Sequence, residues 1–156
     1  MPGRLKCNED ASFSSSTDKV GVGMCIRDEE GCFIRAKTMW HTPLCSVDIG
    51  EALGLHHAIR WVHELQLQNV DFEVDSKRVA DYFNRGNGDI TEFGVIMGSN
   101  RHYCSLCLPN SHVEFSRRQA NGVAHKLAKA AISESSFRIF DHVPTCINDL
   151  ISNEML

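Results

Sequence analysis

The chain has 156 residues, of which 42% are hydrophobic and 23% charged, with a formal net charge of −4. These values fit one globular domain with a sizeable core. The charge excludes a strongly basic protein, so any contact with phosphates has to come from a local patch. Seven cysteines, without an apolar signal segment or a run of transmembrane length, predict reduced thiols in an intracellular protein, nuclear or cytoplasmic.

Three strands are predicted in the first quarter of the chain. Leu5–Asp10 is a short polar strand, and the Ser-rich segment 11–19 that follows is expected to be a loop. Val20–Arg27 and Cys32–Met39 alternate apolar and small or polar residues around the turn 28–31, which is typical of a β-hairpin. We therefore expect three neighbouring antiparallel strands.

The first helix is predicted over Asp48–Gln66. Asp48 has the character of an N-cap, with Glu51 at the third helical position. Glu51 lies off the apolar stripe of the helix, on a face that it shares with Gly54 and Ala58. Small residues let that face approach another element closely, so Glu51 is either a functional carboxylate or only part of the helix cap.

The stretch Val70–Ser76 (VDFEVDS) predicts the fourth strand. Its apolar residues alternate with Asp71, Glu73 and Asp75, so three acids and no base share one face. Asp75 stands where the strand ends and a helix begins, which is a good position for a cation ligand. The alternative is a half-exposed strand followed by an N-cap at Ser76.

The remaining pattern consists of three helices and one more strand. Helices are predicted over Ser76–Arg85, Thr91–Leu108 and Ala120–Ser133, and a strand over Ser111–Phe115. We expect one domain over residues 1–136, then a C-terminal tail, 137–156, that packs on its surface. The order of elements predicts an α/β fold with a five-stranded mixed sheet, three strands antiparallel and two parallel, flanked by helices.

Five segments together resemble a known family. They are NEDAS (8–12), VGVGMCIRDEEGCFIRA (20–36), IGEALGLHHAI (49–59), VDFEVDSKRVADYF (70–83) and RRQANGVAHKLAKAA (117–131). In this order and spacing they resemble the ribonuclease H type 1 superfamily, and in particular the plant ribonuclease H-like domains related to non-LTR retrotransposon polyproteins. The resemblance covers roughly residues 5–133 and implies the ribonuclease H-like fold.

The resemblance implies a metal-dependent endonuclease that hydrolyses the RNA strand of RNA–DNA hybrids. Asp10, Glu51 and Asp75 match three of the four metal-binding carboxylates of the family, which hold two Mg²⁺ ions. Without the resemblance, Asp10 could equally be an Asx-turn residue. The fourth position, four residues after Asn121, holds His125 in place of an aspartate. Because imidazole suits softer metals, we expect weaker binding of the second Mg²⁺, some use of Mn²⁺ and reduced activity; alternatively, His125 is only an exposed helix residue.

A second departure concerns the loop before the last helix, where active family members carry a mobile histidine. Here that loop holds Arg117 and Arg118, which cannot shuttle protons at neutral pH but can hold a phosphate. The predicted nucleic-acid-binding residues are Lys77, Arg78, Arg117, Arg118 and Asn121, with Lys126 and Lys129 adding to the basic surface. Each of these basic residues could also be an ordinary solvated charge.

The pair Cys104 and Cys107, with His102 and His112 nearby, could ligate zinc. Because both cysteines fall on a predicted helix and no second CxxC exists, buried thiols are favoured.

Three hypotheses of function follow from the sequence. The leading one is the hybrid-cleaving hydrolase; the others are a non-catalytic nucleic-acid-binding module and a protein-interaction module that docks through the tail.

Overall fold

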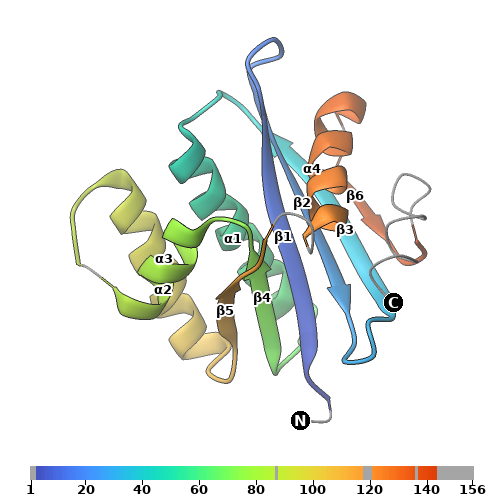
Figure 1. Ribbon diagram of the computed structural model, residues 1–156, viewed down its shortest axis with the longest axis vertical. Helices are drawn as coiled ribbons and strands as arrows, with labels where there is room; N and C mark the ends of the chain where they lie inside the picture. The colour runs from blue at the N-terminus through green and yellow to red at the C-terminus, as the bar shows by residue number, and fades with distance from the viewer. Residues whose placement is uncertain (1–2, 87, 118–120, 136, 144–156) are drawn as a thin grey trace.

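The computed structural model describes residues 3–86, 88–117, 121–135 and 137–143. They form an α/β fold around one six-stranded mixed sheet with strand order β5-β4-β1-β2-β3-β6 (Figure 1). The strands are β1 (Leu5–Ser14), β2 (Lys19–Arg27), β3 (Phe33–His41), β4 (Val70–Val74), β5 (His112–Phe115) and β6 (Arg138–Phe140), and the helices are α1 (Val47–Glu64), α2 (Lys77–Arg85), α3 (Glu92–Cys107) and α4 (Gly122–Glu134).

The first five strands confirm the predicted sheet. β1, β2 and β3 are antiparallel neighbours, whereas β4 pairs parallel to β1 and β5 parallel to β4. The structure adds β6, which pairs antiparallel to β3 and was assigned to the tail. Its three residues carry too little pattern to identify a strand from sequence. The rest of the predicted tail, 144–156, lies outside the described residues.

The first hairpin is longer than its sequence indicates. Segment 11–19 was expected to be a loop, but β1 continues to Ser14 and pairs with β2 through the partners Ser14 and Lys19. The prediction was wrong because the regular ladder with β2 satisfies the backbone of these polar residues and outweighs their local preference for turns.

Helix starts follow local capping chemistry at two of the three positions predicted. The hydroxyls of Ser76 and Thr91 accept hydrogen bonds from the first turns of α2 and α3, as expected. The predicted N-cap of α1 was wrong: Ser46 caps that helix, and Asp48 lies in its first turn. Asp48 instead forms an ion pair with Arg78 of α2.

The sheet is covered by helices on both faces. α1 and α4 pack against strands of the sheet, and α3 lies against α1 and α2 (Figure 1). The larger core surrounds Trp61, Phe72 and Leu55 between the sheet and α1 to α3; a smaller one, under α4, contains Cys25 and Leu127. Among the described residues, no helix is long and apolar enough to cross a membrane.

The pairing of β1 changes along its length, and this positions the candidate site. β4 accompanies β1 only as far as the pair Glu9 and Val74, whereas β2 continues beyond Asp10. Next to Asp10, therefore, β1 has a strand partner on one side only. In open α/β sheets, ligands bind at such points, where neighbouring strands diverge beyond their carboxyl ends.

Candidate metal centre

Three carboxylates from three elements meet beside this end of β1. Asp10 (β1), Glu51 (α1) and Asp75 (directly after β4) each offer an oxygen, and these oxygens all lie within 4.8 Å of one another. Asp10 is fully buried and Glu51 is 6% exposed, while Asp75 is partly exposed. The structure therefore brings together the three acids singled out in the sequence, in a spacing that suits a shared divalent cation.

The surroundings disfavour the charged form of Asp10. Burial first, and then the charge of Glu51 and the contact with Asp75, raise the pKa of Asp10 to about 9. Its Oδ1 atom is buried and has no hydrogen-bond partner among the described residues. A divalent cation would relieve both problems, because it neutralises neighbouring carboxylates and takes up the oxygen as a ligand. The donor set thus fits a hard cation such as Mg²⁺ or Mn²⁺.

His125 lies at the fourth position of this cluster. It is in the first turn of α4, and its Nδ1 is 2.7 Å from Oδ2 of Asp10. The imidazole is 24% exposed, whereas the Asp10 side chain is fully buried. His125 is therefore not simply an exposed helix residue, because it is partly buried and contacts the most buried acid of the cluster.

The acidic face of β4 is not one continuous acidic surface. Asp71 pairs with Arg4, whose Nε lies 3.1 Å from the carboxylate. Glu73 pairs with Lys6 at 2.7 Å and accepts a hydrogen bond from Asn8 at 2.9 Å. Lys6 of the neighbouring strand β1, and Arg4 directly before that strand, therefore neutralise two of the three acids, and only Asp75 joins the cluster.

A buried acid that the sequence analysis missed lies directly before Asp10. Glu9 is 1% exposed, and neither carboxylate oxygen has a hydrogen-bond partner among the described residues. Burial, followed by the charges of Glu51 and Asp10, raises its pKa well above the usual range. It fits against α1 only because Gly54 has no side chain: a Cβ there would lie 2.3 Å from Oε2 of Glu9. The sequence signal that could have identified Glu9 is its position among the inward-facing residues of β1.

The predicted nucleic-acid-binding residues have different surroundings. Lys77 and Arg117 are exposed, and Lys77 follows Asp75 by two residues. Arg78 is exposed but forms an ion pair with Asp48 and lies over the ring of Phe93. Arg118 lies outside the described residues, and Asn121 is 1% exposed with its side chain bonded inside the protein.

The cysteine pair of α3 does not meet the histidines in a metal-binding arrangement. The described residues contain two groups of three or more potential metal ligands, the acidic cluster and a set in the β2–β3 turn, and neither includes Cys104 or Cys107. Cys104 is buried, which raises the pKa of its thiol to about 12. This agrees with the favoured reading of these cysteines as packed thiols.

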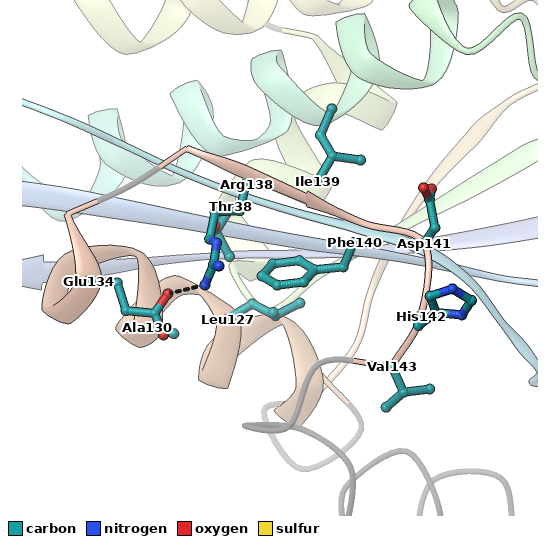
Figure 2. Close-up of a pocket in the computed structure, with 10 residues that line it drawn as sticks. All are labelled: Thr38, Leu127, Ala130, Glu134, Arg138, Ile139, Phe140, Asp141, His142 and Val143. Carbon is teal, nitrogen blue, oxygen red and sulfur yellow. Dashed lines mark hydrogen bonds and ion pairs between the residues drawn. The ribbon is translucent and has the colours of Figure 1, made fainter.

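A cavity of about 480 Å³ lies on the other side of α4 (Figure 2). Leu127 and Phe140 form part of its apolar lining, and an ion pair between Glu134 and Arg138 borders it. None of the acidic cluster residues lines this cavity, so it is not the pocket of the candidate metal centre.

The fold and the candidate metal centre together define the class of protein to which this chain belongs. A mixed sheet with this strand order, with carboxylates from β1, α1 and the end of β4, is a ribonuclease H-like domain. Residues 8–131 match the family model described as reverse transcriptase-like, and the chain belongs to this family. A search of curated proteins gave no match.

Solved structures support the fold. The chain is similar to LC11-RNase H1, isolated from compost by a metagenomic approach, with a TM-score of 0.74 and 16% identity over 85% of this chain and 98% of that one. It is also similar to RNase H1 from the archaeon Halobacterium salinarum, with a TM-score of 0.69 and 14% identity over 85% and 99% of the two chains. LC11-RNase H1 has also been solved in complex with an RNA/DNA hybrid. At these identities the likeness establishes the fold.

Proposed function

We propose that this protein is a divalent-cation-dependent endonuclease that hydrolyses the RNA strand of RNA–DNA hybrids. The observation that carries the proposal is the convergence of Asp10, Glu51 and Asp75 within 4.8 Å in a ribonuclease H-like fold. The hybrid bound by LC11-RNase H1 supports the choice of substrate. The resemblance to plant non-LTR retrotransposon domains supports a shared origin with those elements.

In this proposal, the three carboxylates hold Mg²⁺, with His125 as a fourth ligand for a second ion. When bound, the two ions supply activation of a water molecule and stabilisation of the leaving oxygen in an in-line displacement. With a cation bound, the Asp10 and Glu51 carboxylates would be ionised, and because both side chains are buried, water would screen their attraction for the cation little. Lys77 and Arg117, both exposed, would hold phosphates of the hybrid.

In this proposal, His125 determines the metal preference and the rate of cleavage. A nitrogen ligand favours Mn²⁺ over Mg²⁺, and its contact with Asp10 already occupies one carboxylate oxygen. We therefore propose a weakened enzyme that works better with Mn²⁺ than with Mg²⁺.

The test is cleavage of an end-labelled RNA–DNA hybrid, first in Mg²⁺ and then in Mn²⁺. Asp75→Asn should abolish cleavage, because it removes a charged ligand. Asp141→Asn is the matched control: it makes the same change at an exposed acid that pairs with Arg35, away from the cluster. Absence of cleavage with either metal, by protein that is folded by circular dichroism, would overturn the proposal.

One observation favours a second candidate function. Because His125 is bonded to Asp10 where an aspartate would bind metal, the domain could bind hybrids without cutting them. The same experiment separates the two functions. A hybrid that is retained by the protein in a filter-binding assay but stays intact in both metals would support the binding module.

A further inference from the structure

The contact between His125 and Asp10 joins two elements far apart in the chain. Two structural features set the geometry of this contact. One fixes how close α4 lies to the sheet, and the other fixes where the helix begins along β1. Both involve buried residues outside the acidic cluster.

The first of these features is a pair of glycines in β2, Gly21 and Gly23, which both lie against the backbone of α4. Gly23 is the strand partner of Asp10, and a Cβ at Gly23 would lie 2.4 Å from the backbone oxygen of Ala124 and 2.4 Å from the nitrogen of Ala128. The backbone of α4 therefore rests directly on β2. This close approach brings the first turn of α4 within hydrogen-bond reach of Asp10.

The second feature is a network of buried amides at the start of α4. Oδ1 of Asn121 accepts a hydrogen bond from Nδ2 of Asn8 at 2.9 Å, and Nδ2 of Asn121 donates to the carbonyl oxygen of Glu9 at 2.7 Å. Asn8 is fully buried, and Asn121 is 1% exposed. Asn121 thus binds the two residues that immediately precede Asp10.

Asn8 is itself held from both neighbouring strands. Its Oδ1 accepts a hydrogen bond from Arg27 of β2 at 2.8 Å, and its Nδ2 also donates to Glu73 of β4 at 2.9 Å. Both hydrogens of the Asn8 amide are therefore used, and its orientation is fixed. A buried network with its donors satisfied in this way specifies one arrangement of the elements that it joins.

The use of Asn121 is unusual for a residue at a helix start. Asparagine is among the preferred N-caps, yet the Asn121 side chain makes no capping hydrogen bond to α4. The backbone carbonyl of Asn121 accepts a hydrogen bond from the backbone N–H of His125 at 3.1 Å, so His125 lies one turn further along the helix. The side chain thus joins the helix to β1 in place of capping it, with His125 one turn from the attachment.

We propose that Asn121 is a positioning residue: by fastening the first turn of α4 to Asn8 and Glu9, it sets the contact between His125 and Asp10. This inference deepens the proposed function and, for its consequence on cation binding, rests on it. The contact itself is tested without metal or substrate, which keeps the two distinguishable.

The first measurement is the imidazole signal of His125 in ¹H–¹⁵N spectra of the metal-free protein, identified by its loss in His125→Ala. Asn121→Ala should change this signal to that of an imidazole no longer bonded to Asp10. Asn100→Ala is the matched control, because Asn100 is equally buried and donates to the carbonyl of Ala52 in α1. It should lower the melting temperature but leave the His125 signal unchanged.

The second measurement is the affinity for Mn²⁺, followed by the electron paramagnetic resonance signal of the free ion. Asn121→Ala should weaken binding about tenfold, as is usual when a residue that orients a ligand is removed. In a His125→Ala background the same substitution should weaken it less than about twofold, because the two residues act through one contact.

Loss of the His125 signal pattern in Asn121→Ala, together with the non-additive Mn²⁺ effect, supports the inference. An unchanged pattern in Asn121→Ala, with a loss of stability like that of Asn100→Ala, overturns it and makes Asn121 merely structural. Wild-type protein that shows the contact but cleaves no hybrid would count against the proposed function alone. If wild-type protein binds no Mn²⁺, the imidazole signal still decides.

Discussion

At the scale of single residues, His125 is where this site differs most from an all-carboxylate cation site. Mg²⁺ prefers oxygen ligands in octahedral geometry, whereas an imidazole offers one nitrogen and no fixed negative charge. Here the ring also bonds to Asp10, the most buried of the three acids. The identity of residue 125 should therefore control which metal the protein uses.

We expect His125→Asp to raise the Mg²⁺-dependent rate of hybrid cleavage about tenfold, because it adds an oxygen ligand and releases the Asp10 carboxylate. A titration of the rate against Mg²⁺ concentration measures this. His112→Asp adds the same charge at an exposed position of β5 and should change little. Equal rates for parent and His125→Asp would show that residue 125 does not limit metal use.

Glu9 leads to a prediction on pH and stability in the metal-free protein. Its pKa is raised in the folded state by burial and by Glu51, from about 4.3 in an unfolded chain. A raised folded pKa means that stability is greatest below the unfolded pKa and is lost as pH rises towards the folded value. Asp10, with its pKa raised to about 9, acts with the same sign.

In EDTA, the wild-type protein should therefore lose stability steadily between about pH 4.5 and pH 9, because these two carboxyls resist ionisation when folded. Glu9→Gln should reduce this slope, since it removes one of the two titrating groups. Urea unfolding at a series of pH values measures it, with Glu64→Gln, an exposed acid at the end of α1, as the control. Identical slopes in Glu9→Gln and wild-type protein would contradict the assignment.

At the scale of elements, the packing of α4 on β2 depends on glycine. Gly23→Ala should destabilise the fold by about 2 kcal/mol or more, because the added methyl group meets the backbone of α4 at 2.4 Å and the helix has to move. The movement should also separate His125 from Asp10. Urea unfolding measures the first effect, and the imidazole signal of His125 the second.

Gly98 provides the opposite case in the same protein. It lies in the interior of α3, is exposed, and has no atom within 4 Å of an added Cβ. Gly98→Ala should therefore stabilise the protein by about 0.5–1 kcal/mol through helix propensity alone. Similar effects of the two substitutions on the free energy of unfolding would refute the role given to Gly23.

The elements also show what the sequence could predict. Caps such as Ser76 and Thr91 were predicted because their chemistry acts within three residues. The extension of β1 to Ser14 and the strand β6 were not, because they depend on pairing with distant segments. For the same reason the sequence indicated the three acids of the cluster but not the hydrogen bond of Asn8 to Asn121, which joins residues 113 positions apart.

At the scale of the whole molecule, a net charge of −4 has to coexist with binding of a polyanion. The acidic face of β4 adds little to this conflict, because Arg4 and Lys6 neutralise its Asp71 and Glu73. Divalent cations would neutralise the cluster itself. The bases left to contact phosphates are then few, which predicts modest affinity that depends on salt.

Lys77 and Arg117 are the bases from which we expect most of this salt dependence. Both are exposed, and neither forms an ion pair among the described residues, whereas Arg78 already pairs with Asp48. In an Asp75→Asn background that does not cleave, the logarithm of hybrid affinity should fall linearly with the logarithm of salt concentration. Each lost phosphate contact should reduce the slope by about 0.7–0.9.

Replacing Lys77 and Arg117 together by Gln should thus lower the slope by about 1.5, with a smaller effect on the affinity extrapolated to 1 M salt. Fluorescence anisotropy of a labelled hybrid at four or more salt concentrations gives both quantities. Lys19→Gln is the control, because Lys19 lies over the ring of Trp40 and bonds to Ser135. An unchanged slope in the double variant, with normal affinity, would place the phosphate contacts on other bases, of which Lys126 and Lys129 on the exposed side of α4 are the next to test.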